Sequence, residues 1–499
     1  MQKRKLLLGM DVGTTSLKAS LVDESMNIIC QSELSALGKN SCEISMSVLW
    51  EKFCCVIKQL HQKSEDLWVY LEGIGVSGQG DGLWLLDKDL QALGNAIIWN
   101  DMRAKVLHHR IARDIEAVRL LEKANQLLPG NSPMLLRWIK EFEPERYAKI
   151  GHIVSCKDWL NYCLTGEIAT DITSAATAGL NLATQKVSVP LWHALDISEC
   201  IDQFPPIVQA ETVIGYVTTQ ASIHTGLKAG LPVICGLLDG SAVLFGAQVP
   251  FGQGCTIGGT TLANTVVTDE RDIPDHFDAL ILPHAVTGNN VYSYSCLNGA
   301  GTSDYIDELL LPGWDRREEE DYIANVPAGC EGLLFQPYLI GERAPFVCPD
   351  ATAGFFGMRP HHTRAHMVKA MYEGMAFSSK DAYDCIGKPL AKLYLTGGLS
   401  NSRFYAQLFS DVIGLPVGRI KTKYLGTLGV ARIIALGLSV KGNSAEFSPP
   451  ESEMFYPNPS KHALYQDWFA FFVTLREKML PIWSLRGSII ERMHLSELV

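Results

Sequence analysis

A hairpin pattern that occurs twice, far apart in the sequence, constrains this chain more than any other feature. Residues 6–24, LLLGMDVGTTSLKASLVDE, place two apolar strands around a Gly-Thr-Thr-Ser turn. Residues 254–270, GCTIGGTTLANTVVTDE, repeat the arrangement around Gly-Gly-Thr-Thr. Together with alternating strand and helix patterns, this repetition predicts two duplicated α/β lobes. The Pro/Gly cluster at residues 249–252 divides them into residues 1–249 and 250–499.

Both turns combine glycine backbone N–H groups with threonine hydroxyls, a chemistry suited to holding phosphate oxygens. Such turns are also common in ordinary β-structure, so either one alone is weak evidence. The repetition, and Asp11 just before the first turn, favour the phosphate interpretation. No Gly-x-x-x-x-Gly-Lys-Ser/Thr motif occurs, which argues against a P-loop enzyme.

The composition, 47% hydrophobic and 19% charged, is that of a globular chain of two or three domains. A net charge of -11 argues against nucleic-acid binding. The 13 cysteines form no Cys-x-x-Cys motif, so we expect reduced thiols and a cytoplasmic location. The longest apolar stretch, residues 230–247, contains Asp239, and this charge favours a core strand and buried helix over a membrane span.

One glycine-rich stretch, GIGVSG at residues 73–78, has the spacing of a dinucleotide-binding fingerprint. That fingerprint requires a helix directly after the glycines, because the pyrophosphate lies on the helix N-terminus. Apolar strand-like residues follow here instead. We therefore interpret the spacing as fortuitous, and expect the stretch to deliver the following Gln-Gly-Asp-Gly residues to a binding site.

Several motifs in one order resemble the FGGY carbohydrate kinases of the actin-like ATPase superfamily. They are DVGTTSLKASLVDE at Asp11, SCKDWLNYCLTGEIATDITSAATAG at Ser155, IGGTTLANT at Ile257, GERAPF at Gly341, HMVKAMYEGMAF at His366 and LTGGLSNS at Leu395. The resemblance implies two RNase H-like lobes with an interlobe cleft, a first lobe that binds sugar and phosphate, and a second that binds the nucleotide.

The resemblance also implies roles for individual residues. Asp239 would be the catalytic base that accepts the proton of the attacking sugar hydroxyl, although an aspartate between a strand and a helix is often only an N-cap. Asp11 would hold Mg²⁺, and ATP would be bound by Gly13, Thr14, Thr15, Gly259, Thr260, Thr261, Gly397, Gly398 and Asn401. Relatives often carry an acidic residue before a Gly-Ala-Ala helix, whereas residues 425–431 here read LGTLGVA, so adenosine contacts from this segment are in doubt.

The sugar would be bound by Gln79, Asp81, Trp99 and Asp239. Xylulose kinases tend to carry Met-His where Gly80 and Asp81 stand here, so Asp81 is expected to influence which substrate fits. For Arg103, in the Asp-x-Arg pair with Asp101, a structural ion pair is the preferred interpretation. The resemblance favours a terminal hydroxyl of a ketopentose of the xylulose or L-xylulose type, with erythritol or another small polyol as the alternative.

A different class of function is an actin-like regulatory ATPase that transfers no phosphate to sugar. Asp239 and the signature around residues 157–159 argue against it. An apolar stripe along residues 462–480 predicts a helix that packs on the second lobe or forms a homodimer surface. The pairs His108-His109 and His361-His362 have no acidic or cysteine partner at ligand spacing, and are interpreted as surface histidines.

Overall fold

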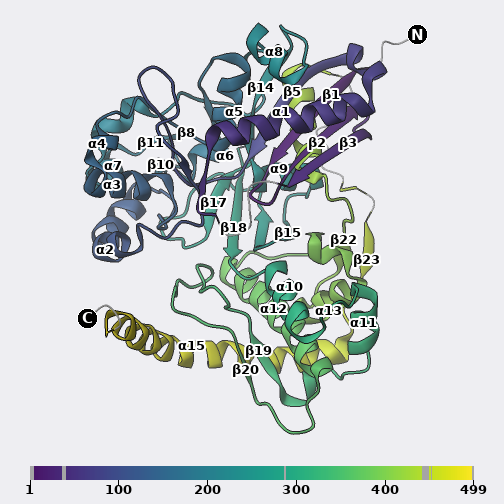
Figure 1. Cartoon of the computed structure of the whole chain (residues 1–499). Helices are drawn as coiled ribbons and strands as arrows, with labels where there is room; N and C mark the ends of the chain where they lie inside the picture. The colour runs from purple at the N-terminus through teal and green to yellow at the C-terminus, as the bar shows by residue number, and fades with distance from the viewer. Residues whose placement is uncertain (1–4, 36–40, 286–287, 441–448, 451, 497–499) are drawn as a thin grey trace. The chain divides into compact units, whose positions relative to one another are not determined.

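The computed structural model in Figure 1 describes residues 5–35, 41–285, 288–440, 449–450 and 452–496. The chain forms two compact units. The first comprises residues 1–248, 270–290 and 424–447, and the second comprises residues 249–269, 291–423 and 448–499. The chain therefore first passes from one unit to the other at the Pro/Gly cluster, and two later segments belong to the first unit.

The first unit has a six-stranded sheet in the order β13-β14-β5-β1-β2-β3. These strands are β1 (Leu6–Val12), β2 (Ser16–Asp23), β3 (Ile28–Ser35), β5 (Leu71–Gly78), β13 (Val213–Tyr216) and β14 (Pro232–Leu238). Its longer helices are α1 (Met46–Lys63), α2 (Lys105–Leu121), α3 (Ser132–Phe142), α5 (Cys156–Thr165), α7 (Val189–Ala194), α8 (Thr219–Thr225), α9 (Asp239–Ala247) and α14 (Leu425–Gly437).

Shorter elements complete the first unit: β4 (Glu43–Ile44), η1 (Glu65–Tyr70), β6 (Trp84–Leu86), β7 (Ala96–Ile97), α4 (Pro144–Tyr147), β8 (His152–Val154), β9 (Thr170–Asp171), α6 (Ile172–Ala175), β10 (Leu180–Asn181), β11 (Lys186–Val187), η2 (Ser198–Gln203), β12 (Ile207–Val208) and β17 (Leu280–Pro283).

In the second unit the strand order is β18-β16-β15-β21-β22-β23. The elements are β15 (Gln253–Gly258), β16 (Leu262–Val267), β18 (Asn290–Cys296), α10 (Ala300–Leu310), α11 (Arg316–Ile323), η3 (Cys330–Gly332), β19 (Leu334–Gln336), β20 (Gly354–Phe356), α12 (Arg364–Ile386), β21 (Leu393–Gly397), η4 (Gly398–Asn401), α13 (Arg403–Ile413), β22 (Val417–Arg419), β23 (Glu453–Phe455) and α15 (Pro459–Ser496).

Five strands of each sheet, β3-β2-β1-β5-β14 and β18-β16-β15-β21-β22, have the same topology, which confirms the predicted duplication. Each begins with an antiparallel hairpin, β1-β2 or β15-β16. In each, the first hairpin strand also pairs in parallel with a later strand, β5 or β21. The hairpin turns, at Gly13–Thr15 and Gly259–Thr261, therefore occupy equivalent positions. The α/β fold predicted from the sequence is observed.

Helices cover both faces of the first sheet, and successive side chains of β1 face α1 and α14 in turn. Leu6, Leu8 and Met10 belong to the same buried cluster as α1 residues such as Phe53, and α1 is visible along the sheet in Figure 1. On the other face, β1 carries Gly9, where a Cβ atom would lie 2.2 Å from the Thr427 backbone oxygen of α14. Helix α14 can therefore approach the backbone of β1 closely.

The glycines of GIGVSG have the same role. They lie within β5, and no helix follows before β6, which confirms that the dinucleotide spacing is fortuitous. A Cβ atom at Gly73 would lie 2.7 Å from Leu438, and one at Gly75 would lie 2.9 Å from Val430. These glycines make room for the helix α14 segment that packs on the sheet.

The cysteines and the apolar helices bear on the predictions of reduced thiols and of no membrane span. All 13 cysteines are free, as expected from their spacing. No helix in the described ranges combines the length and the apolar character that a membrane span needs.

Candidate active site

Three parallel strands of the first unit end at one sheet edge, and each contributes a polar residue there. Asp11 of β1 is paired with Ser77 of β5. Leu238, the last residue of β14, is paired with Gly78 of the same central strand. Asp239 follows directly as the first residue of α9. The sheet therefore brings Asp11 and Asp239 to the edge where α/β proteins generally bind ligands.

Asp11 is a buried carboxylate with two neighbours that the sequence analysis did not include in the site. Ser77 Oγ donates a hydrogen bond of 2.8 Å to Asp11 Oδ1. Lys18 lies opposite Asp11 in the β1-β2 hairpin. Burial raises the pKa of Asp11, while the Lys18 charge and the Ser77 hydrogen bond oppose this rise. The signal for Lys18 was the hairpin register, which pairs it with Asp11 across a short turn.

Asp239 combines partial exposure with a strongly shifted acidity. Its Oδ1 accepts a hydrogen bond of 2.6 Å from Gly240 N, and α9 begins at Asp239 itself, so the residue is not the helix N-cap. Loss of solvation, with a further contribution from the negative charges of Asp11 and Asp81, raises the pKa of Asp239 to about 7. A carboxylate with this pKa can accept a proton near neutral pH and release it afterwards.

The first turn joins the predicted phosphate residues to the predicted sugar residues. Thr14 Oγ1 donates to Gln79 Oε1 at 3.2 Å and accepts from Trp99 Nε1 at 2.9 Å. Thr15 is exposed, and Gly13 N donates to Ser16 O across the turn at 3.1 Å. The orientation of the Thr14 side chain therefore depends on Gln79 and Trp99, two of the residues assigned to the sugar.

Asp81 has a backbone conformation that is rare for a residue with a side chain. Its φ angle is +57°, in the left-handed region. Asn131 Nδ2 donates a hydrogen bond of 2.6 Å to Asp81 Oδ1, and Asn131 itself is buried. Asn131 was not predicted as a site residue, because its only signal in the sequence is its position before the Ser-Pro start of α3. This contact fixes the orientation of the Asp81 carboxylate.

Arg103 forms ion pairs, as predicted. Its Nη2 lies 2.6 Å from Glu43 Oε1 and 2.8 Å from Asp101 Oδ2. The guanidinium also lies over the Trp138 ring, 5.3 Å from its centroid. Arg103 therefore holds together the segment that follows Trp99.

In the second unit, the predicted nucleotide residues also gather at one sheet edge. Gly258 of β15 is paired with Gly397 of β21, so the turn that carries Thr260 lies beside Gly398. Gly397 has φ +81°, and a Cβ atom on it would lie 2.6 Å from Gly258 O. Thr260, Gly398 and Asn401 are exposed. The second unit therefore presents two adjacent glycine-rich turns.

A buried glutamate supports the second turn and was missed in the sequence analysis. Glu342 Oε1 accepts from Leu297 N at 2.7 Å, and Glu342 Oε2 accepts from Asn298 Nδ2 at 3.3 Å. The next residue, Gly299, donates its N–H to Thr260 O at 3.1 Å. Burial raises the pKa of Glu342 to about 7, although these hydrogen bonds oppose the rise. Glu342 lies in the GERAPF motif, but its contact with Leu297 joins segments 45 residues apart and has no local signal.

The segment 425–431, whose adenosine contacts were in doubt, forms the start of α14 in the first unit. All seven residues are buried. Thr427 Oγ1 donates to Ser20 Oγ at 2.7 Å. A Cβ atom on Gly426 would lie 2.4 Å from Asp11 Oδ2. The segment therefore packs in the first unit, and Gly426 leaves room for the Asp11 carboxylate.

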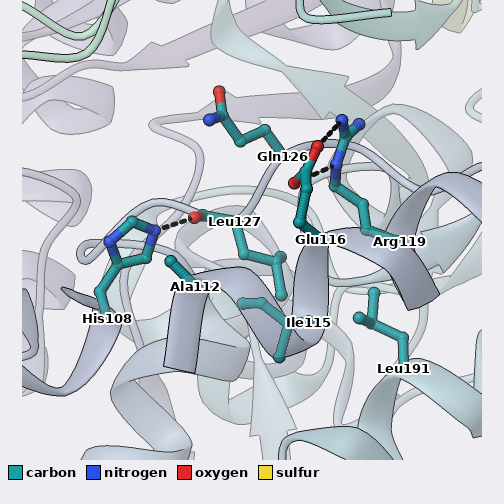
Figure 2. A pocket seen from close by; sticks show the side chains of 8 residues that line it. All are labelled: His108, Ala112, Ile115, Glu116, Arg119, Gln126, Leu127 and Leu191. Carbon is teal, nitrogen blue, oxygen red and sulfur yellow. Dashed lines mark hydrogen bonds and ion pairs between the residues drawn. The ribbon is translucent and has the colours of Figure 1, made fainter. Parts of the chain in front are cut away.

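The first histidine pair, His108-His109, lies on α2. His108 lines a cavity of about 50 Å³ between α2 and α7, where its Nε2 donates to Leu127 O at 2.9 Å (Figure 2). Glu116 and Arg119 form an ion pair at its rim. A volume of this size suits one or two waters rather than a sugar. Burial lowers the pKa of His108, which corrects its interpretation as a simple surface residue.

The second pair gains an acidic neighbour through the fold. Glu331 Oε2 lies 3.4 Å from His361 Nε2 and 3.5 Å from His366 Nε2. Even so, the described part of the chain contains no group of three His, Cys, Asp or Glu residues that could hold a metal ion. A divalent cation near Asp11 would therefore need additional ligands from water or a bound phosphate, as is usual for Mg²⁺.

Comparison with known proteins agrees with this architecture. The N-terminal domain of the FGGY family of carbohydrate kinases matches residues 6–246, and its C-terminal domain matches residues 279–438. The L-xylulose/3-keto-L-gulonate kinase of Escherichia coli is 31% identical, over 92% of this chain and 94% of its own. The erythritol kinase of Brucella abortus is 26% identical, over 98% of this chain and 99% of its own.

Among solved structures, gluconate kinase from Lactobacillus acidophilus is 25% identical, with a TM-score of 0.87 over 96% of this chain and 99% of its own. These relatives share a reaction type but differ in the substrates named for them. Together with the topology of the two sheets, the matches establish that the chain belongs to the FGGY family of carbohydrate kinases and is an ATP-dependent sugar kinase.

Proposed function

We propose that this kinase transfers the γ-phosphate of ATP to a terminal hydroxyl of a ketopentose of the xylulose or L-xylulose type, with Asp239 as the catalytic base. The observation that carries the proposal is the position of Asp239 at the sheet edge beside Asp11, with a pKa of about 7. A base of this acidity is largely ionised at slightly alkaline pH, yet basic enough to accept a hydroxyl proton.

In the proposed reaction, the sugar hydroxyl oxygen bonds to the γ-phosphorus of ATP, and the bond to the ADP oxygen breaks. The hydroxyl proton passes to an Asp239 carboxylate oxygen. Gln79, Asp81 and Trp99 bind the other sugar hydroxyls and so fix the attacking oxygen. Such positioning accounts for much of the catalysis of phosphoryl transfer, which requires little covalent chemistry from the protein.

ATP is assigned to the glycine- and threonine-rich turns. Gly13, Thr14 and Thr15 would bind phosphate oxygens from the first unit. In the second unit, Gly259, Thr260 and Thr261 would do the same, while Gly397, Gly398 and Asn401 would contact the nucleoside. Their backbone N–H groups, free of bulky side chains, support this assignment.

Mg²⁺ is assigned to Asp11. The site fits a cation because a buried carboxylate, held by Ser77, lies close enough to Asp239 for their charges to repel. When bound, Mg²⁺ would neutralise charge on the phosphate oxygens. Ser77 would keep the Asp11 oxygens in place, and Lys18 would limit the local negative charge.

The substrate alternative is erythritol or another small polyol. The similarity to an erythritol kinase supports it, whereas the higher identity to a kinase named for L-xylulose favours the ketopentose. Family membership gives no support to a regulatory ATPase.

A coupled assay of ADP release with D- and L-xylulose, D- and L-ribulose, erythritol, glycerol and gluconate tests the proposal. A ketopentose should give the highest kcat/KM, and turnover only with a polyol or with gluconate would contradict it.

The proposal extends to a cytoplasmic homodimer that binds no nucleic acid. Free cysteines throughout the chain fit a compartment that keeps thiols reduced. Helix α15 exposes Ile482, Leu485 and Ile489 along one stripe, and such a stripe can pair with its own copy about a two-fold axis. Sedimentation velocity should give about twice the chain mass of 54.9 kDa, and a monomer at micromolar concentration would contradict the dimer.

A further inference from the structure

Strand β14 is irregular just before it delivers Asp239. Its pairing with β5 is regular at Val233 and Ile234, then shifts, and resumes at Leu237. Two residues of β14, Cys235 and Gly236, therefore stand opposite one residue of β5, which is a β-bulge. Gly236 has φ +78°, and a Cβ atom there would lie 1.8 Å from Val76 O. Bulges of this kind redirect the end of a strand.

Three backbone groups at the bulge, the two N–H groups and the Cys235 carbonyl, have partners in the first unit. Cys235 N donates to Thr212 O at 2.9 Å, and Gly236 N donates to Ala210 O at 3.0 Å. Asn161 Nδ2 of α5 donates to Cys235 O at 2.8 Å. Since an unpaired buried backbone group is costly, these contacts maintain the bulged conformation.

Beyond the bulge, one side chain holds the residue that precedes Asp239. Leu238 N donates a hydrogen bond of 2.9 Å to Thr173 Oγ1, and Thr173 is fully buried in the short helix α6. The Thr173 hydroxyl donates in turn to Asp171 Oδ2, which also accepts from Thr173 N at 2.8 Å. Both hydrogen-bonding capacities of the hydroxyl are therefore directed, one toward Leu238 and one toward Asp171.

Asp171 is itself anchored. Lys157 Nζ lies 3.1 Å from Asp171 Oδ1 and 2.6 Å from Asp158 Oδ1. All three side chains are buried. Neighbouring carboxylates raise the pKa of Lys157 despite its burial, so the ammonium stays charged. Displacement of one member of a buried ion pair leaves an uncompensated charge, so Asp171 provides a fixed support for Thr173.

We propose that Thr173 is a positioning residue for phosphoryl transfer: its hydroxyl, supported by Asp171, holds the Leu238 amide so that the bulged end of β14 directs the Asp239 carboxylate toward the sugar hydroxyl. The inference rests on the proposed role of Asp239 as the base. Small displacements of a catalytic group reduce turnover strongly, because the reacting atoms must be held in near-attack geometry.

The test compares Thr173→Val, which keeps the shape but removes the hydroxyl, with Thr173→Ser, which restores it. Thr225→Val is the matched control, because Thr225 is also fully buried and accepts a backbone N–H, from Leu227 at 3.2 Å. Each variant is made alone, and both valine variants are also combined with Asp239→Asn. Steady-state kcat, sugar Kd by calorimetry, and melting temperature are measured for all. Thr173→Ala replaces the valine variant if the latter does not fold.

Thr173→Val should lower kcat about 10- to 100-fold with sugar Kd within about threefold. Thr173→Ser should retain most of kcat, and Thr225→Val should change only the melting temperature. In the Asp239→Asn background, Thr173→Val should cause no further loss, because the two residues act through one carboxylate. Equal losses in both backgrounds, or unchanged kcat in the single variant, would overturn the inference. If Asp239→Asn alone retains wild-type turnover, the proposed base is wrong instead.

Discussion

Ser77 and Asp11 stand opposite each other on the parallel strands β5 and β1, and Ser77 Oγ donates a hydrogen bond of 2.8 Å to Asp11 Oδ1. This contact links the central strand of the first sheet to the carboxylate assigned to the cation. It fixes one Asp11 oxygen and leaves the remaining electron pairs of the carboxylate to other partners.

Ser77→Ala should weaken Mg²⁺ binding at Asp11. A buried carboxylate that loses a hydrogen bond is less stable in its ionised form, by about 1–3 kcal/mol. We expect at least a tenfold rise in the Mg²⁺ concentration that gives half-maximal turnover. The measurement is a Mg²⁺ titration at saturating sugar. Ser20→Ala, which removes an equally buried hydroxyl beside Thr427, is the control and should leave the titration unchanged.

Asp239→Asn should abolish most turnover and preserve sugar binding. The amide has nearly the shape of the acid but cannot accept the hydroxyl proton, so kcat should fall by roughly 10²–10⁴-fold. Coupled kinetics and calorimetric sugar binding measure the two effects separately. Asp275→Asn, at an exposed position, is the control for charge removal. A kcat close to that of the wild type would remove Asp239 from the mechanism.

The pH dependence of kcat/KM should show one ionisation near neutrality. The pKa of Asp239 is about 7 in the free protein, and the base must be ionised to act. The rate should therefore be constant above pH 8 and fall about tenfold per pH unit below pH 6. Measurements between pH 5 and 9 at saturating Mg²⁺-ATP would reveal this limb. A profile that stays flat down to pH 5 would show that no group with a pKa of about 7 controls the reaction.

The same shift predicts a stability effect of Asp239→Asn. The folded pKa of Asp239, about 7, lies above its ordinary value of 3.8, so the folded protein binds the extra proton more tightly than the unfolded chain. The stabilisation of the fold by the protonated Asp239 carboxyl is fully present below pH 3.8 and is lost as the pH rises through 7. The neutral asparagine avoids the loss. Without ligands at pH 8, the variant should melt on the order of 5 °C above the wild type.

The difference should shrink as the pH approaches 4, where both side chains are neutral in the folded protein. Differential scanning fluorimetry at pH 8, 6 and 4.5 measures it. A variant that is less stable than the wild type at pH 8 would show that ionised Asp239 does not destabilise the fold.

Asp81→His should change the sugar preference. The carboxylate can accept hydrogen bonds from two hydroxyls, whereas an imidazole has a different shape and charge. We expect the ratio of kcat/KM between a ketopentose and erythritol to change about tenfold or more, which is equivalent to one good hydrogen bond. Asn131→Ala, which removes the partner of Asp81 Oδ1, should reduce the discrimination without reversing it. An unchanged ratio in Asp81→His would show that other residues select the sugar.

Local pattern was sufficient to place several candidate site residues on their turns and strands. The Gly-Thr turns, the strand that leads to Asp239 and the apolar helix after it were visible because each depends on residues within one or two elements. The Arg103 ion pair was also predicted, since Asp101 lies two residues away. The dinucleotide fingerprint could also be rejected from local pattern, because the residues directly after the glycines show whether a helix follows.

Contacts between distant segments were not visible. Ser77, Asn131 and Thr173 are common residue types in ordinary surroundings, and only strand register and helix packing place them beside Asp11, Asp81 and Leu238. The return of residues 424–447 to the first unit is a further example. Nothing in that segment's own sequence indicates that Gly426 fits against Asp11, or that Thr427 and Val430 fit against the glycines of β1 and β5.

The sequence by itself therefore determined the duplicated α/β units and the positions of the two Gly-Thr turns, because hydrophobic periodicity and turn chemistry act over a few residues. The phosphate role of the turns and the base role of Asp239 remain predictions, and the latter comes from the family resemblance. Only the tertiary structure decided how those groups are oriented and what acidity they have. The pKa of Asp239 depends on burial and on the charges of Asp11 and Asp81, which are far away in the chain. Burial and Coulomb interactions depend on distance in space, and that distance is set only when the strands pair.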